Sequence, residues 1–334
     1  MALRLPAFRR TMALSRCSSS LGIRPATLRP LSTTALLHKT DANTPHSSTI
    51  LLEDEKTGFG FIRHNARSPK PRKVGVTEIR GPYYSAMGRR YLQDVLETMG
   101  YFIDGLKFAG GSFSLFPEER LRELIDLAHE HGVYVSTGGW AEHILLQSSP
   151  STAIDQYLAK CKSLGFDVVE ISAGFLSIPN DDFVRLVERV QAQGLKAKPE
   201  LGIQFGAGGD TDPATLEAMA GGTSGGAGGG RSPASKIVEL GRRFIEQCGV
   251  ERIMVESEGI TENVGDRWRT EVVRAVLAGL PPEKVMFEAA EPRVFNWYVR
   301  EFGADVNLFV DHSQIGRVER WVFAQQFAYQ QKSS

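Results

Sequence analysis

Eight short apolar runs recur along this chain, and each is followed by a segment with helical periodicity. Strands that alternate with helices form parallel sheets, because each helix carries the chain back before the next strand begins. Eight such units predict an α/β fold, a closed (β/α)8 TIM barrel with an N-terminal extension. The predicted strands are Val74–Ile79, Tyr101–Ala109, Val133–Thr137, Val168–Ser172, Leu195–Leu201, Arg252–Val255, Lys284–Phe287 and Ala304–Val310.

The intervening segments carry helix signals at both ends. The segment Pro117–His131 opens with proline followed by Glu118 and Glu119, residue types that a helix N-terminus prefers. Five glycines stand just after a predicted helix and before a strand, where a left-handed C-cap is expected: Gly132, Gly165, Gly194, Gly249 and Gly303. The predicted helices are Met87–Met99, Pro117–His131, Thr152–Leu164, Asp181–Gln193, Ser235–Cys248, Arg267–Leu280, Arg293–Phe302 and Gln314–Phe327.

The first forty residues differ in composition from the rest of the chain. Residues 1–40 contain seven Lys or Arg and no acidic residue, and they are rich in Ser and Thr. This composition is typical of a mitochondrial transit peptide, and we expect a location in the mitochondrial matrix. A disordered basic tail is the alternative. Residues 41–72 read as a linker or arm, and the barrel is expected over residues 73–328.

One segment interrupts the alternation of strands and helices. Residues 206–231, after the fifth predicted strand, are rich in glycine and poor in apolar residues. They would lie over the C-terminal mouth of the barrel, either as a lid or phosphate cradle or as a flexible insertion. For residues 221–230 we favour the flexible insertion.

Overall charge and hydropathy exclude several classes of partner. The formal net charge of the whole chain is zero, so no basic surface favours nucleic acid. No apolar run is long enough to span a bilayer, so we expect no membrane partner. Cys161 and Cys248 lack ligands at metal-binding spacing, and we interpret both as reduced, packed thiols. A homo-oligomer is expected.

Polar residues cluster at or near the ends of the predicted strands, where barrel enzymes keep their chemistry. Lumen-facing charges are costly unless they are paired, hydrated or bound to metal, so the acids suggest a ring with lysine counter-charges. Hard carboxylate oxygens suit Mg²⁺, and we assign Glu170, Glu256 and Glu288 as its candidate ligands. A buried ion-pair network without a metal is the alternative. The polar residues are Glu78, Lys107, Glu170, Glu200, Glu256, Glu288 and Asn307, with Lys198 two residues before Glu200.

Further candidates lie at the ends of other strands. Catalytic roles are assigned to Lys107, Lys198 and Glu200. Loops after the last strands of such barrels often bind phosphate, and glycines permit close approach of backbone to ligand. Asp311 or Ser313 is expected to be the N-cap of the helix that follows. The predicted substrate-binding residues are Arg80, Gly138, Gly139, Ser172, Asn307 and His312.

One segment of the fourth predicted strand is especially distinctive, Gly165-Phe166-Asp167-Val168-Val169-Glu170-Ile171-Ser172. Further distinctive segments are Gly75–Thr77, Ile103–Phe108, Val133–Gly139, Glu200–Gly202, Val285–Ala289 and Phe302–Leu308. On these segments, and over residues 73–320 as a whole, the chain resembles the phosphosulfolactate synthase family, which includes plant heat-stress-associated proteins.

The resemblance implies a magnesium-dependent enzyme that adds sulfite to phosphoenolpyruvate, and a small phosphorylated or sulfonated acid as its partner. Lys107, Glu170, Glu200 and Glu288 match positions that the family shares. The chain departs from the archaeal pattern where Ile203 and Gln204 follow the fifth strand in place of a lysine. It also departs in strand one, at Glu78-Ile79-Arg80, and after strand six, at Glu256–Gly259. A non-catalytic protein that keeps the barrel but not the reaction is therefore the alternative.

Overall fold

The computed structural model describes residues 67–82, 86–174, 176, 178–203, 233–316 and 318, all within the compact unit His46–Ser334. The predicted transit peptide (1–40), most of the predicted arm (41–72), the glycine-rich insertion (206–231) and the greater part of the last predicted helix lie outside the described residues. Among the described residues, no helix has the length and hydropathy needed to cross a membrane.

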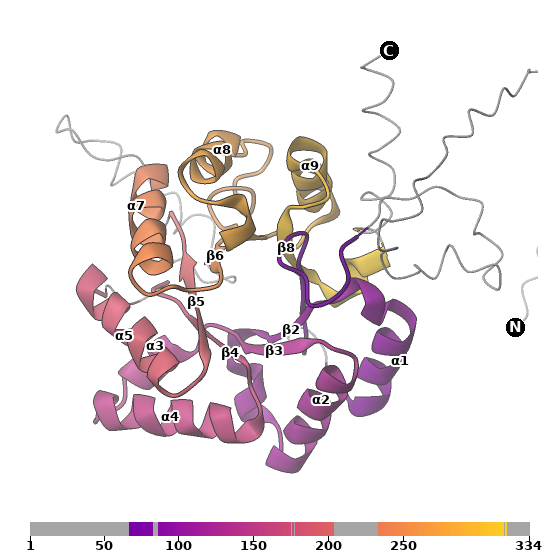
Figure 1. Cartoon of the computed structure of the whole chain (residues 1–334), viewed down its shortest axis with the longest axis vertical. Coiled ribbons are helices and arrows are strands. Elements are labelled where there is room, and N and C mark those ends of the chain that lie inside the picture. The colour runs from indigo at the N-terminus through magenta and orange to yellow at the C-terminus, as the bar shows by residue number, and fades with distance from the viewer. Residues whose placement is uncertain are drawn as a thin grey trace, which may run out of the picture. The chain divides into compact units, whose positions relative to one another are not determined.

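Eight parallel strands form a closed barrel in sequence order, with β8 paired to β1, as Figure 1 shows. This confirms the predicted (β/α)8 fold. Seven of the eight strands are shorter than their apolar runs, chiefly because the runs include loop residues that flank the strand, and β7 has the length of its run but begins one residue later. They are β1 (Thr77–Arg80), β2 (Gly105–Phe108), β3 (Tyr134–Thr137), β4 (Val168–Ile171), β5 (Lys196–Leu201), β6 (Ile253–Val255), β7 (Val285–Glu288) and β8 (Asn307–Asp311).

The helices surround the barrel and bury their apolar stripes against its outer face (Figure 1). The short helix α3, which the sequence analysis did not predict, precedes α4 between β3 and β4. The helices are α1 (Arg89–Met99), α2 (Glu118–Glu130), α3 (Ala141–Leu145), α4 (Pro150–Leu164), α5 (Asn180–Ala192), α7 (Pro233–Glu246), α8 (Thr270–Gly279) and α9 (Pro292–Phe302). Short 3₁₀ turns are η2 (Gly100–Phe102), η3 (Ala109–Leu115), η4 (Pro282–Lys284) and η5 (His312–Gln314).

The connections confirm the glycine prediction. Each of the five glycines expected to follow a helix has a positive φ, from 64° at Gly132 and Gly249 to 99° at Gly165. A left-handed residue ends the helix and turns the chain toward the next strand at little steric cost only if it lacks a Cβ. Cys161 and Cys248 are both free thiols, as predicted.

The barrel has two apolar regions separated by its strands. The larger one lies between the strands and the helices. The smaller one comprises Val76, Met254, Met286 and Phe309, with Tyr134 packed against it, and its members alternate with the outward-facing residues of their strands. The next inward-facing positions toward the C-terminal strand ends are charged, so this apolar cluster forms the floor beneath a polar mouth.

The described end of the predicted arm is attached to the barrel. The Arg72 guanidinium forms an ion pair of 2.9 Å with Asp104 Oδ1 and donates to the carbonyl of Tyr101. The Asp104 carboxylate also accepts from the backbone N–H of Thr77, so the arm is attached to both β1 and the entry to β2.

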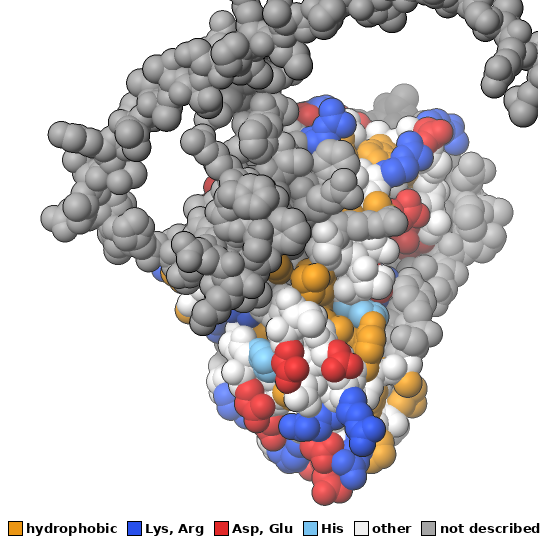
Figure 2. Space-filling view, turned by 90° about the vertical axis from the view of Figure 1, so that its right-hand side faces the viewer, with side chains coloured by type: hydrophobic (Ala, Val, Ile, Leu, Met, Phe, Trp, Pro, Cys, Tyr) orange, Lys and Arg blue, Asp and Glu red, His pale blue; other side chains and the backbone are white. Residues whose placement is uncertain are grey.

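On the molecular face in Figure 2, basic and acidic side chains are interspersed where described residues are drawn.

Candidate active site

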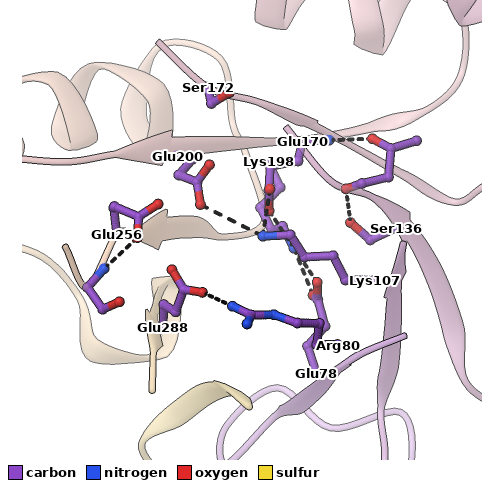
Figure 3. Close-up of polar contacts among 12 residues, drawn as sticks. Glu78, Arg80, Lys107, Ser136, Glu170, Ser172, Lys198, Glu200, Glu256 and Glu288 are labelled. Atoms are coloured by element: carbon purple, nitrogen blue, oxygen red, sulfur yellow. Dashed lines mark hydrogen bonds and ion pairs between the residues drawn. The ribbon is translucent and has the colours of Figure 1, made fainter. Parts of the chain in front are cut away.

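Charged side chains from several strands and from the residue after β6 meet in the C-terminal half of the lumen (Figure 3). On β1 and β5 the charged residues lie two apart, so that each pair faces the lumen. The cluster consists of Glu78 and Arg80 from β1, Lys107 from β2, Glu170 from β4, Lys198 and Glu200 from β5, Glu256 just after β6, and Glu288 at the end of β7.

The deeper part of the cluster is a buried chain of ion pairs around Lys198. Its Nζ lies 2.6 Å from Glu78 Oε1 and 3.1 Å from Glu170 Oε2. Burial alone would raise the pKa of Glu78, but the ammonium groups of Lys198 and Lys107 and hydrogen bonds from Lys198 and Tyr134 outweigh it and lower that pKa. Lys198 is therefore neutralised by two carboxylates.

Lys107 links this chain to the mouth. Its Nζ lies 2.6 Å from Glu170 Oε1, 3.7 Å from Glu200 Oε1 and 4.2 Å from the centre of the Phe309 ring. Burial would lower the pKa of Lys107, but the surrounding carboxylates, Glu170 first, outweigh it and raise that pKa. Lys107 is thus a fixed positive charge rather than a proton donor at neutral pH.

Glu200 lies beside Lys107 and carries an unusual protonation state. Its side chain is 13% exposed, and burial together with the charge of Glu170 raises its pKa to about 8 against the opposing effect of Lys107. A carboxyl group with that pKa holds its proton at neutral pH. Such a group can serve as a general acid.

Glu256 and Glu288 form a carboxyl pair at the rim. Burial and the charges of Glu288 and Glu200 raise the pKa of Glu256 well above its usual range. Burial would also raise the pKa of Glu288, but a hydrogen bond from Glu256 and the neighbouring Arg80, which forms an ion pair with Glu288, lower it. The two carboxyl groups therefore titrate as a coupled pair, with the pKa of Glu256 raised and that of Glu288 lowered.

This carboxyl pair has the donor set for a divalent cation. Single oxygen atoms from Glu200, Glu256 and Glu288 lie within 4.8 Å of one another. Carboxylate oxygens this close repel one another unless a proton or a cation lies among them, and a hard divalent cation can supply that compensation. Glu170, predicted as a ligand, lies instead between Lys107 and Lys198, and two ammonium groups at this carboxylate disfavour a cation there. The sequence prediction for Glu170 is corrected accordingly.

Two predicted substrate-binding residues lie beside Glu200. A Cβ on Gly139 would fall 2.6 Å from Ser172 Oγ and 3.6 Å from Glu200 Oε2, so this glycine keeps the space next to Glu200 open. The Ser172 hydroxyl donates to Glu142. Gly138 does not face this space, because a Cβ there would meet the backbone of Ala109 and Gly110 at 2.7 Å. Its small size serves packing against the end of β2.

The structure contradicts the predicted roles of Asn307 and His312. Asn307 begins β8, at the N-terminal end of the barrel, where its amide accepts from the N–H of Val76 and donates to the carbonyl of Val285. His312 is near the mouth, but its ring nitrogens contact the carbonyl of Arg80 and the hydroxyl of Tyr91 at 3.0 and 2.9 Å. Neither side chain has a group left for substrate. Asp311 caps η5 by accepting from the N–H of Ser313, as expected.

Sequence reasoning missed three residues that support the site. Glu78 was noted at a strand end but not assigned, although it is the main partner of Lys198. Tyr134 donates to Glu78 across the lumen at 2.7 Å. Glu142 in α3 accepts from Ser172 and from the backbone N–H groups of Gly174 and Leu176, which fixes the loop after β4. Of these three residues, only Glu78 could have been found from the sequence, because it lies two residues before Arg80 and therefore on the same face of the strand.

A parallel barrel with a buried lysine–carboxylate cluster at the C-terminal mouth has the architecture of the TIM-barrel enzymes, whose active sites lie there. The chain belongs to the (2R)-phospho-3-sulfolactate synthase (ComA) family, whose model matches residues 65–321.

Individual relatives include both plant and archaeal proteins. The chain is 40% identical to the protein HEAT-STRESS-ASSOCIATED 32 of Arabidopsis thaliana over 266 residues, covering 78% of this chain and 89% of the relative. It is 24% identical to the phosphosulfolactate synthase of Methanothermobacter thermautotrophicus over 247 residues, covering 72% and 85%. A 28% match to the phosphosulfolactate synthase of Methanocaldococcus jannaschii covers 34% of this chain and 44% of that protein.

Proposed function

We propose that this protein is a magnesium-dependent synthase that adds sulfite to phosphoenolpyruvate, or a close analogue of it, at the barrel mouth. Family membership supports the reaction class. The observation that carries the proposal is geometric: Glu200, whose pKa burial raises to about 8, lies beside the Lys107 ammonium and close to the carboxyl pair of Glu256 and Glu288.

In this proposal Glu256 and Glu288 hold the magnesium ion. When bound, the ion would supply positive charge for the substrate carboxylate and for the enolate that develops from it. Lys107 and Arg80 attract and orient the anionic groups of the substrate, since both cations face the mouth beside Phe309. The open space at Gly139 admits the substrate next to Glu200.

The proposed reaction needs one proton. The sulfur lone pair of sulfite forms a bond to the terminal carbon of phosphoenolpyruvate, and the double-bond electrons move toward the carboxylate. Carbon two then takes a proton, and no group leaves. Glu200 supplies this proton because its carboxyl is protonated below about pH 8 and lies 3.7 Å from the charge that would hold the substrate. Lys198, assigned to catalysis from the sequence, instead positions Glu170 and Glu78 from below.

The test is a direct assay of the purified full chain. Phosphoenolpyruvate, sulfite and Mg²⁺ are incubated with the protein, and ³¹P NMR follows loss of substrate and formation of the sulfonated phosphate ester. Glu200→Gln should reduce the rate by about 10²–10⁴-fold, since glutamine keeps the shape but donates no carboxyl proton. Glu118→Gln is the matched control, because Glu118 is exposed on α2 and forms surface ion pairs there. Equal rates for both variants would refute the assigned role of Glu200.

A non-catalytic role is the second candidate, and two observations favour it. The plant heat-stress-associated relative is the more similar of the nearly full-length matches described above. Among the described residues of the mouth, Arg80, Lys107 and Lys198 each already contact a carboxylate, so no cation of the three is uncommitted. Absence of product from the wild-type protein at any sulfite or Mg²⁺ concentration would overturn the enzyme proposal and favour this one.

A further inference from the structure

A small pocket lies at the N-terminal end of the barrel, beneath the ion pairs of Lys198, and it opens to solvent beside the exposed side chains of Lys196 and Glu251. Its volume is about 30 Å³, which exceeds the space that one water molecule needs. Strands β3 to β5 and the residues that enter β6 line it. The lining residues are Tyr134, Val168, Lys196, Ala197, Lys198, Glu251 and Arg252.

Arg252 brings a largely buried guanidinium to this pocket. The residue is 7% exposed, and its Nε is buried without a hydrogen-bond partner among the described residues. Within the part of the chain that the structure describes, its ionic contact is a long one of 3.8 Å from Nη2 to Glu251 Oε1. Buried N–H donors nearly always find acceptors, so the Nε–H calls for an acceptor that the described residues do not supply, either water or an anion.

The charges around the cavity indicate what kind of acceptor fits. Lys198 is already neutralised by Glu78 and Glu170, and the Tyr134 hydroxyl donates to Glu78. Lys196 and Arg252 remain, against the single carboxylate of Glu251, whose oxygen lies 2.6 Å from Lys196 Nζ. Arg252 is therefore the buried cation of this pocket that has no carboxylate closer than 3.8 Å among the described residues, which favours an anion over a neutral ligand.

We propose that this cavity binds a small monovalent inorganic anion of the size of chloride, held by the Arg252 guanidinium. A pocket of about 30 Å³ accommodates one such ion beside the Arg252 Nε. The bound ion stabilises the barrel by satisfying a buried donor group. The site lies at the opposite end of the lumen from Glu200, Glu256 and Glu288. The anion proposal therefore does not depend on whether the proposed reaction is correct.

The test is thermal unfolding of the full chain in sodium chloride against sodium gluconate, with the sodium concentration held constant. Gluconate, a much bulkier organic anion, serves as the reference anion. Because a ligand of the folded state raises the melting temperature, chloride at tenfold excess over its Kd should raise Tm by about 3 °C, and above Kd the rise should grow with the logarithm of the chloride concentration. A melting temperature that is the same in both salts would overturn the proposal.

Two further measurements locate the anion. Arg252→Met should abolish the chloride-dependent rise, whereas Arg122→Met, at an exposed position on α2 that pairs with Glu118, should retain it. If Arg252→Met fails to fold, wild-type crystals soaked in bromide give the answer from anomalous scattering. A bromide peak within hydrogen-bond distance of the Arg252 guanidinium supports the site, and water alone at that position overturns it.

Discussion

At the scale of single residues, the charge balance inside the barrel depends on lysine side chains that each contact two carboxylates. Lys198 contacts Glu78 and Glu170, and Lys107 contacts Glu170 and Glu200. Removing one member of such a buried set leaves an uncompensated charge, which costs far more than an exposed ion pair contributes. The two lysines therefore stabilise the fold by neutralising buried carboxylates. We expect their removal to lower the stability of the protein before any other property.

We expect Lys198→Met to destabilise the fold by about 3–5 kcal/mol, because Glu78 and Glu170 would be buried without their shared ammonium. Urea denaturation at pH 7 measures this change. Lys160→Met is the control, since Lys160 pairs with Glu118 on the surface and its loss should cost about 0–1 kcal/mol. Equal, small losses for both variants would show that the Lys198 ion pairs are not needed for stability.

The strand pattern predicted which residues face the lumen but not which ones pair. Alternation along β5 placed Lys198 and Glu200 on one face, as the structure has them. Their partners come from β1, β2 and β4, and the contacts depend on strand tilt and stagger, which no local pattern encodes. For this reason Glu170 was expected to bind metal and is found between two lysines.

At the scale of elements, the sequence predicted the order and type of all eight strands but misplaced some of their ends. The apolar run Ala304–Val310 includes the turn that enters β8, which begins at Asn307. Asn307 therefore lies at the N-terminal end of its strand rather than near the mouth, and its amide binds backbone groups. Apolar runs mark burial, and entering loops are buried as well as strands, so runs alone cannot fix strand boundaries.

Strands β2 and β3 pack closely where Gly105 faces Tyr134, and adding one methyl group at Gly105 tests how much this close packing contributes to stability. A Cβ on Gly105 would fall 2.3–2.7 Å from the ring atoms and hydroxyl of Tyr134, its partner in register. Gly105→Ala should force this ring to move, weaken its hydrogen bond to Glu78, and cost about 1–3 kcal/mol in unfolding free energy.

Chemical denaturation of Gly105→Ala is compared with Gly316→Ala, where the nearest atom to a new Cβ is Met99 Cε at 4.0 Å. The control substitution should be neutral or slightly stabilising, because alanine has a higher helix propensity than glycine and position 316 is helical. Replacing Tyr134 by valine in the Gly105→Ala background should recover part of the loss. Full additivity of the two changes would contradict a direct clash between these residues.

At the scale of the whole molecule, the charges of the mouth make stability depend on pH in two directions. The lowered pKa values of Glu78 and Glu288 stabilise the fold above the usual glutamate pKa, and this contribution is lost as pH falls. The raised pKa values of Glu200 and Glu256 act the other way. Their contribution is complete below the usual glutamate pKa of 4.5 and is lost as pH rises, for Glu200 through about 8.

This opposition predicts how magnesium should act on the intact protein. A cation held by Glu256 and Glu288 displaces the proton on Glu256, so its apparent affinity should rise by up to about tenfold per pH unit while that proton is present. The rise in Tm caused by a fixed Mg²⁺ concentration should accordingly be larger at pH 8.5 than at pH 6.5, measured at constant ionic strength. Glu256→Gln should remove this difference and Glu118→Gln should keep it, because Glu118 lies exposed on α2. A magnesium effect that is independent of pH, or that persists in Glu256→Gln, would show that the ion binds elsewhere and that the carboxyl pair at the mouth is a proton-sharing pair alone.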